Sequence, residues 1–280
     1  MKLIECPRDA MQGLGHFVPT DLKIRYLNAL LAVGFDTLDF GSFVSPKAIP
    51  QMRDTPEVLA GLNMSTTKTR LLAIVANVRG AEQAVASGLI QYVGFPLSVS
   101  ETFQQRNTNK SIAQAFTEVA EMQSLCERTG KELVVYLSMG FGNPYGDAYS
   151  PDLVGEFTEQ LVELGVRIIA PSDTVGSSTP EAIEALFQPL ISRFPQVEFG
   201  AHLHARPGEA PAKVRAAVRA GVRRVDGALR GFGGCPMAAD QLTGNLPTEE
   251  IIQTLAQEGV NLTINQESFQ KALTLSAGVF

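Results

Sequence analysis

The sequence predicts a single (β/α)8 barrel (TIM barrel) over residues 1–280, with a short helical extension at the C-terminal end. Short β-rich runs alternate with amphipathic helical patterns, and eight such units fit a chain of this length. Polar residues also gather where the predicted strands end, which is where barrels carry their chemistry. A doubly wound open sheet is the alternative, but the segment "CPRDAMQG" after the first strand lacks the glycine-rich turn that it prefers.

The predicted strands are short and mostly continuously apolar. This composition is typical of parallel strands that are covered on both faces. The strands are predicted at residues 2–6, 35–40, 71–77, 91–95, 132–138, 166–172, 197–204 and 223–229.

The helices between the strands are marked by their start and stop residues. Residues 20–34 open on a Thr-Asp cap and close on Gly34, and residues 150–165 have Ser150 as the N-cap and Pro151 in the first turn. Residues 179–191 and 247–259 follow the same start rule. These signals place a helix after several of the strands, as the barrel requires.

Composition and charge narrow the classes of partner. Hydrophobic residues make up 45% of the chain, charged residues 19%, and the net charge is −6 without a lysine-rich tract. We therefore expect neither a nucleic-acid partner nor a membrane partner. The three cysteines (Cys6, Cys126 and Cys235) are odd in number and far apart, and the N-terminus does not resemble a signal peptide, so we expect a cytoplasmic protein.

Two of the three histidines, His202 and His204, lie two residues apart in "GAHLHAR". Residues i and i+2 of a strand point to the same face, so both imidazoles are predicted to face the barrel lumen near its mouth. Asp9, after the first strand, could add a carboxylate, and Asn245, after the last, could add an amide oxygen. This set suits Mg²⁺ or Mn²⁺, although the two histidines could instead only form hydrogen bonds at a strand end.

Several segments resemble the 3-hydroxy-3-methylglutaryl-CoA lyase family of metal-dependent barrel enzymes, which also includes aldol-type synthases. The resemblance rests on "CPRDAMQG", "GFDTLDFGSFVSPKAIPQM", "SDTVGSSTP", "GAHLH" and "GFGGCPMA…LTGNLPTEEI", in order from residue 4 to about residue 260. It implies that the cation is bound by Asp9, His202, His204 and Asn245. It also implies that the catalytic arginine, aspartate and loop cysteine are Arg8, Asp173 and Cys235, and it places Asp39 where the lyases usually carry Glu.

The implied reaction is a retro-Claisen cleavage of a 3-hydroxyacyl-CoA to acetyl-CoA and acetoacetate, a step of leucine degradation. Asp173, with His202 as a possible helper, would remove the hydroxyl proton, and Arg8 would stabilise the enolate oxygen. Cys235 would give or relay a proton to carbon, and Asp39 would either orient Arg8 or act directly. The structural alternatives are a helix cap for Asp173 and an inert apolar filler for Cys235.

Two departures from the family pattern bear on the substrate. The lysine that the lyases carry after the first motif, and that contacts the CoA phosphates, is absent, and Arg106 and Lys110 could replace it. Ala205 and Arg206 stand where the family has Asp-Thr, which removes a carboxylate that could orient a metal-bound imidazole. Two other functions therefore remain open: an aldolase or condensing enzyme acting on a 2-oxo acid, and a non-catalytic acyl-CoA-binding barrel. The resemblance also favours a homodimer.

Overall fold

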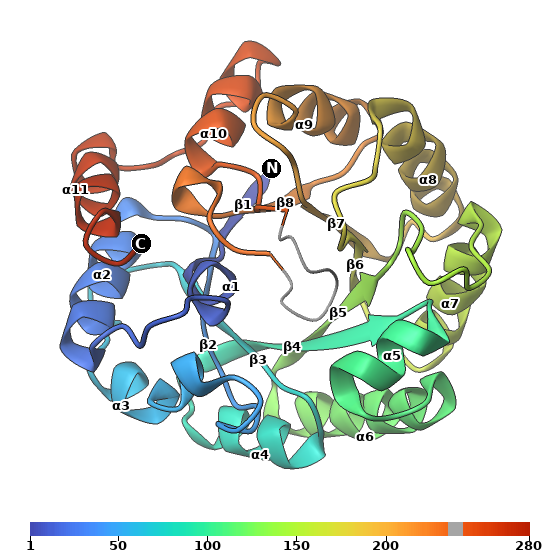
Figure 1. The fold of residues 1–280 in the computed structure, drawn as a ribbon, viewed down its shortest axis with the longest axis horizontal. Coiled ribbons are helices and arrows are strands. Elements are labelled where there is room, and N and C mark those ends of the chain that lie inside the picture. The colour runs from blue at the N-terminus through green and yellow to red at the C-terminus, as the bar shows by residue number, and fades with distance from the viewer. Residues whose placement is uncertain (235–242) are drawn as a thin grey trace.

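The computed structural model describes residues 1–234 and 243–280 and shows a closed barrel of eight parallel strands surrounded by helices (Figure 1). Each strand pairs with the next along the chain, and β8 pairs with β1 to close the barrel. The strands are β1 (Lys2–Glu5), β2 (Thr37–Ser42), β3 (Arg70–Ile74), β4 (Ile90–Ser98), β5 (Glu132–Ser138), β6 (Ile168–Asp173), β7 (Glu198–Leu203) and β8 (Arg224–Gly227). The predicted TIM barrel is confirmed.

The helices form the outer ring, and α11 adds the predicted C-terminal extension, which packs against α2 (Figure 1). The helices are α1 (Pro7–Gln12), α2 (Thr20–Val33), α3 (Thr55–Ala60), α4 (Val78–Ala86), α5 (Glu101–Thr108), α6 (Ile112–Thr129), α7 (Pro151–Glu163), α8 (Pro180–Arg193), α9 (Ala210–Arg219), α10 (Thr248–Gln257) and α11 (Gln266–Ser276). Two short 3₁₀ helices, η1 (Pro50–Met52) and η2 (Leu229–Gly231), complete the described elements.

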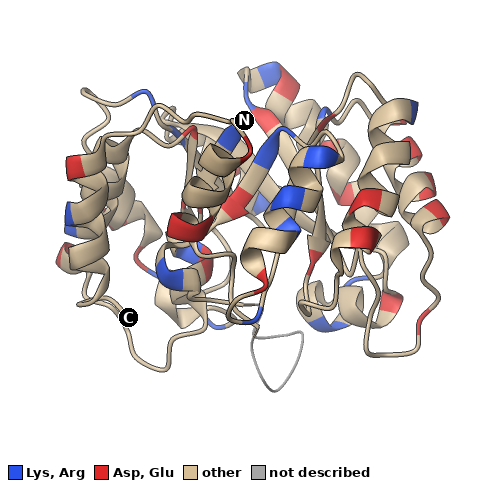
Figure 2. Ribbon diagram, turned by 90° about the horizontal axis from the view of Figure 1, so that it is seen from above, with Lys and Arg blue, Asp and Glu red and all other residues tan. Residues whose placement is uncertain are grey.

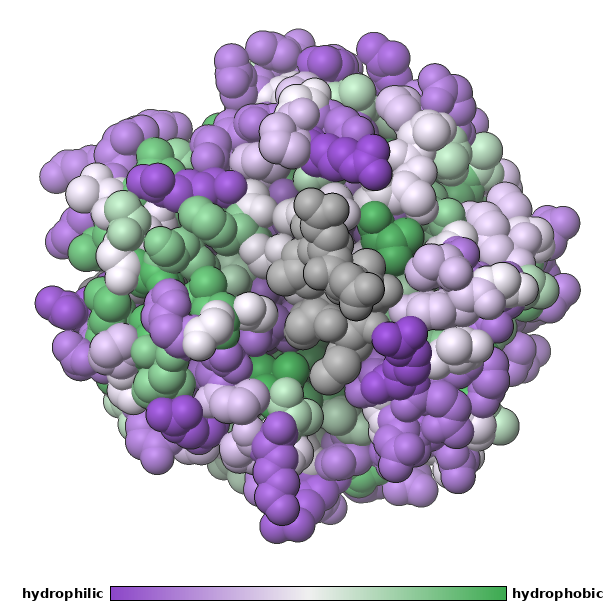
Figure 3. Space-filling view, in the orientation of Figure 1, coloured by the Kyte–Doolittle hydropathy of each residue, from purple (hydrophilic) through white to green (hydrophobic). Residues whose placement is uncertain are grey.

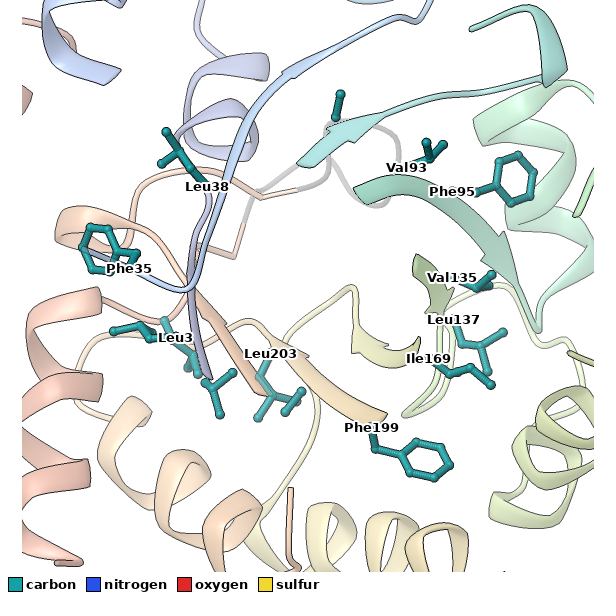
Figure 4. Packing of buried hydrophobic residues seen from close by; sticks show 14 of the residues in the cluster. Leu3, Phe35, Leu38, Val93, Phe95, Val135, Leu137, Ile169, Phe199 and Leu203 are labelled. Atoms are coloured by element: carbon teal, nitrogen blue, oxygen red, sulfur yellow. The ribbon is translucent and has the colours of Figure 1, made fainter. Parts of the chain in front are cut away.

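Alternation along the strands divides the apolar side chains into two layers. Val135 and Leu137 of β5 point outward against the helices, as do Phe95 and Phe199 (Figure 4). The intervening side chain of Tyr136 belongs to a smaller cluster inside the barrel. Successive side chains of a strand point to opposite faces, and both faces are covered here, so the strands read as continuous apolar runs.

The helix caps agree in part with the sequence signals. Ser150 caps α7, with its hydroxyl accepting from the Leu153 N–H, and Gly34 ends α2 with a φ of +88° that glycine adopts readily. The predicted Thr-Asp cap of α2 is wrong, because Pro19 occupies the cap position and the Thr20 hydroxyl donates to Asp54 instead.

Most strand ends differ from the predicted ones by one to three residues, and the differences in β2 and β3 change the place of a polar residue. β2 continues to Ser42 and shifts its register between Asp39 and Gly41, so Asp39 lies inside the strand rather than at its end. β3 ends at Ile74, and Asn77 is the N-cap of α4.

The surface carries basic and acidic side chains interspersed along the helices (Figure 2). On the face shown in Figure 3, hydrophilic side chains occupy most of the outer rim, and hydrophobic ones are exposed mainly on the side of α2. Among the described residues, no helix has the length and apolar character that crossing a membrane would need.

Candidate active site

A pocket of about 440 Å³ opens at the carboxyl ends of the strands. Its wall includes Arg8 and Asp9 from α1, His202 from β7 and His204 just after β7. α1 follows β1 directly and was not predicted as a helix. It begins with Pro7 in its first turn and holds Arg8 and Asp9 buried beside the barrel mouth.

Three potential metal ligands converge in this pocket. Asp9, His202 and His204 each offer one donor atom, and these atoms lie within 4.8 Å of one another. Both ring nitrogens of His204 are buried without a hydrogen-bond partner among the described residues. A buried polar atom without a partner is costly, so the unpartnered imidazole fits a site that receives a cation.

Asn245 joins this group through Asp9. Its Nδ2 donates to the Asp9 carboxylate at 2.7 Å and to the Phe232 carbonyl at 2.9 Å. A backbone bridge pairs Asn245 with His204, so the segment after β8 lies against the end of β7. All four ligands implied by the resemblance are therefore brought together.

At His204 and Asp9, the surroundings favour the protonation states that a cation needs. Burial, together with the neighbouring charge of His202, lowers the pKa of His204 to about 4. Burial raises the pKa of Asp9, but the charge of Arg8 and of the two histidines outweighs it and lowers the pKa to about 2. A neutral imidazole and a carboxylate are thus present together at neutral pH.

Arg8 is held in place by two carboxylates. Its Nε donates to Asp39 at 3.0 Å, its Nη2 donates to Asp39 at 2.5 Å, and its Nη1 donates to Asp9 at 3.1 Å. Gln12 accepts from Nη1 at 2.9 Å and donates to Asp9 at 2.7 Å. Burial raises the pKa of Asp39 to about 6 against the opposing charge of Arg8. The guanidinium group of Arg8 is therefore held in one orientation on the pocket wall, mainly by its hydrogen bonds to Asp39.

Asp226 on β8 was not identified from the sequence. Its Oδ2 lies 3.1 Å from Nδ1 of His202, and its side chain is buried. Burial lowers the pKa of His202, but the hydrogen bond and charge of Asp226 outweigh it and raise the pKa. Asp226 therefore provides the orienting carboxylate that Ala205 cannot, and it does so from the neighbouring strand.

Asp173 is placed differently from Arg8, which lines the pocket. Ser172 and Thr174 line the pocket, whereas the Asp173 carboxylate points to the other side of the strand. It accepts from the backbone N–H groups of Ser177 and Ser178, from the Ser178 hydroxyl, and from Lys213 Nζ at 3.0 Å. These hydrogen bonds tie the carboxylate to the segment after β6 and to α9.

The remaining predicted residues lie at the rim or outside the described chain. Arg106 and Lys110 both line the pocket. The Arg106 guanidinium lies 5.2 Å from the Tyr145 ring centroid, and Lys110 is paired with Glu118 and donates to the Ala76 carbonyl. Cys235 lies outside the described residues.

Comparison with known proteins agrees with this arrangement. The model of the HMGL-like family matches residues 3–275. A cytoplasmic 3-hydroxy-3-methylglutaryl-CoA lyase of Rattus norvegicus is 32% identical over 273 residues, which are 97% of this chain and 79% of that protein. A hydroxymethylglutaryl-CoA lyase of Bacillus subtilis is 32% identical over 266 residues, which are 95% of this chain and 88% of that protein.

The fold comparison gives the same relationship. The structure of an HMG-CoA lyase from Acinetobacter baumannii in complex with coenzyme A and 3-methylmalate superposes with a TM-score of 0.91 and 30% identity. The superposed region covers 99% of this chain and 90% of the lyase chain. The chain therefore belongs to the HMGL-like family.

Proposed function

We propose that this protein is a divalent-metal-dependent carbon–carbon lyase that cleaves 3-hydroxy-3-methylglutaryl-CoA, or a close relative, to acetyl-CoA and acetoacetate. The observation that carries the proposal is the convergence of Asp9, His202 and His204 in one pocket, where neither His204 nitrogen has a hydrogen-bond partner within residues 1–234 and 243–280. Asn245 would complete the ligand set, and its mixture of nitrogen and oxygen donors suits Mg²⁺ or Mn²⁺. When bound, such an ion would hold substrate oxygens and lower the pKa of the substrate hydroxyl.

Arg8 is proposed to stabilise the negative oxygen of the thioester enolate that forms when the carbon–carbon bond breaks. It lines the pocket, and its pairing with Asp39 keeps the planar fork in one orientation. Asp39 is therefore assigned the orienting role. Cys235 stays the candidate for giving a proton to carbon.

Asp173 is not placed to remove the hydroxyl proton, and His202 is proposed as a ligand of the ion. His202 lines the pocket, and donation from Nδ1 to Asp226 leaves the lone pair of Nε2 available. That lone pair would bind the ion, so His202 is not assigned as the base that removes the hydroxyl proton. Asp173 has four donors outside the pocket, so we assign it to holding the ends of β6 and β7 together.

The basic residues at the rim of the pocket favour a CoA thioester as the substrate over a free 2-oxo acid. Arg106 lies on the pocket wall with its guanidinium over Tyr145, where its charge could meet a CoA phosphate. Lys110 is already paired with Glu118, which makes it the weaker candidate. The HMG-CoA lyase structure that contains coenzyme A supports the same substrate class.

The test compares two substrate classes with Mg²⁺ or Mn²⁺ added. We expect thioester cleavage with 3-hydroxy-3-methylglutaryl-CoA and no retro-aldol cleavage of 2-oxo acids. Arg106→Ala should raise the KM for the acyl-CoA by about tenfold, the worth of one exposed charge-assisted contact, while Lys110→Ala changes it less. Activity on a 2-oxo acid alone would favour the aldolase alternative, and turnover of neither class by metal-loaded protein would favour a non-catalytic acyl-CoA-binding barrel.

We also propose that the protein forms a homodimer. Its mass in solution, measured by analytical ultracentrifugation, tests this.

A further inference from the structure

A second group of potential metal ligands is buried behind His202, and only His202 of this group lines the pocket. Cys6, which follows β1 and precedes α1, comes together there with His202 and Asp226. Each offers one donor atom, and the three atoms lie within 4.8 Å of one another. His202 belongs to both groups, whereas Cys6 and Asp226 are not ligands of the Mg²⁺ or Mn²⁺ site proposed above, in which Asp226 only orients His202.

The donors of this second group differ in chemistry from those of the first. A thiol, an imidazole and a carboxylate form a set that selects Zn²⁺ or Cd²⁺ over Mg²⁺, because soft sulfur binds thiophilic ions strongly. Hard carboxylate and amide oxygens, as in Asp9 and Asn245, favour Mg²⁺ or Mn²⁺ instead. The two groups therefore share one ligand and differ in ion preference.

Neither Cys6 nor Asp226 is fully engaged in the structure. The Cys6 thiol contacts the Ile4 carbonyl at 3.9 Å, which is long even for a hydrogen bond from sulfur. Oδ1 of Asp226 is buried without a hydrogen-bond partner among the described residues. A buried carboxylate oxygen that lacks a partner gains by receiving a cation.

The surrounding charges also favour a cation at this place. Burial raises the pKa of the Cys6 thiol well above its usual range, and so do the carboxylates of Asp226, Asp39 and Asp9, with Arg8 opposing them. The carboxylates that make proton loss to water costly also attract a divalent cation. Arg224, two residues before Asp226 on β8, adds an opposing positive charge, so binding depends on the thiolate that forms as the ion enters.

We propose that Cys6, His202 and Asp226 form a site for a thiophilic divalent cation such as Cd²⁺ or Zn²⁺. The metal–sulfur bond forms as the thiol proton leaves to solvent, with no change of oxidation state. Because His202 is shared and two divalent ions a few ångströms apart repel each other, occupation of this site excludes an ion bound by Asp9, His202 and His204. The protein would then be inhibited by thiophilic ions without any change in its fold.

The test uses the thiolate-to-cadmium charge-transfer band in the ultraviolet, a readout that requires no substrate. The chain has three cysteines, so the Cys126→Ser/Cys235→Ser double variant keeps Cys6 as its only thiol. We expect this variant to show the band on titration with Cd²⁺, and the band to saturate at one ion per chain. Absence of the band overturns the proposal.

The complementary variant is Cys6→Ser, with Cys126→Ser as the matched control because Cys126 is also buried, in α6. Cys6→Ser should weaken Cd²⁺ binding by at least about 100-fold, since even partners that only orient a metal ligand are worth about 10- to 100-fold. Mn²⁺ affinity, measured by electron paramagnetic resonance, should stay unchanged. Undiminished Cd²⁺ affinity in Cys6→Ser, or unchanged Mn²⁺ affinity in wild-type protein loaded with Cd²⁺, contradicts the proposal. Both results are independent of which substrate the enzyme cleaves.

Discussion

At the scale of single residues, the hydrogen bond between His202 and Asp226 decides which imidazole nitrogen faces the pocket. With Nδ1–H directed at Asp226, 3.1 Å away, Nε2 is left free to bind an ion. Asp226→Asn removes the charge that favours this tautomer. We expect Mn²⁺ affinity to fall by about 10- to 100-fold, as measured by electron paramagnetic resonance titration. Glu82→Gln, an exposed acid-to-amide change on α4, is the matched control, and equal affinities in both variants would argue against an orienting role.

The buried ion pair of Asp173 and Lys213 gives a second prediction for single residues. Lys213 Nζ donates to Asp173, to the His204 carbonyl at 2.7 Å and to the Gly176 carbonyl, so all three of its protons are used. Asp173→Asn leaves the buried ammonium with only the partly exposed Glu209 carboxylate, 4.0 Å away, as a paired counter-charge among the described residues, and we expect a loss of about 3–5 kcal/mol in the free energy of unfolding. Denaturant titration measures the loss, and adding Lys213→Met should recover part of it.

The activity of that double variant separates the two roles considered for Asp173. If Asp173 only positions the ends of β6 and β7, Asp173→Asn/Lys213→Met keeps most of the thioester cleavage of the wild type. If Asp173 is the general base, the double variant stays about 10²- to 10⁴-fold slower however well it folds. The kcat of the double variant, measured at saturating substrate, decides between them.

The site residues that the sequence predicts are those whose evidence is local. The spacing of His202 and His204 predicts that both side chains lie on one face of a strand, and the position of Asp9 directly after a strand predicts a carboxylate at the barrel mouth. The sequence around Asp226 and Lys213 contains no such local signal. Asp226 pairs with His202, 24 positions away, and Lys213 of α9 pairs with Asp173, 40 positions away, so both contacts form only when the barrel assembles. An acid inside the last predicted strand was the one available signal for Asp226.

At the scale of elements, Glu5 ties β1 to the segment that follows β8. Its carboxylate accepts from the Leu229 N–H at 2.9 Å and from the Thr248 hydroxyl at 2.5 Å, at the start of α10. Burial raises the pKa of Glu5 to about 8, although these two hydrogen bonds oppose it. The native state therefore holds a proton on Glu5 that the unfolded chain loses near pH 4.5.

This raised pKa fixes the sign of a pH dependence. The stabilisation is fully present below about pH 4.5 and is lost as pH rises through about 8. Glu5→Gln keeps an acceptor but cannot ionise, so its free energy of unfolding should fall less between pH 6 and pH 9 than that of the wild type. Denaturant titrations at both pH values measure the two slopes, and equal slopes would show that Glu5 titrates normally.

Helices and strands could be predicted where several residues in a row carry the same signal. The eight strands and the helices α7 and α8 follow from apolar runs and caps. α1 was missed because six residues are too few to show helical periodicity. The register shift at Asp39 was missed because it depends on the pairing of β2 with β3, which a single strand does not reveal.

At the scale of the whole molecule, the proposed metal site links the segments that follow the first and the last strand of the barrel. Asp9 follows β1, and Asn245, which follows β8, donates to it from 236 positions further along the chain. An ion bound by Asp9, His202 and His204 would therefore strengthen the closure that the pairing of β1 with β8 already makes. Its binding free energy adds to the stability of the entire fold, because the unfolded chain cannot assemble the site.

The last prediction follows from this linkage and from the unpartnered imidazole of His204. At a free Mn²⁺ concentration about 100 times Kd, the wild type should gain about 2.7 kcal/mol, or about 5 °C in Tm, over protein in excess chelator. His204→Leu should lose this gain. Without metal it should be at least as stable as the wild type, because each buried polar group that lacks a partner costs about 1–3 kcal/mol and the variant removes two such nitrogens. Thermal unfolding with and without Mn²⁺ tests both parts: a metal-free variant that melts well below the metal-free wild type would mean that His204 stabilises the barrel itself, and not an ion.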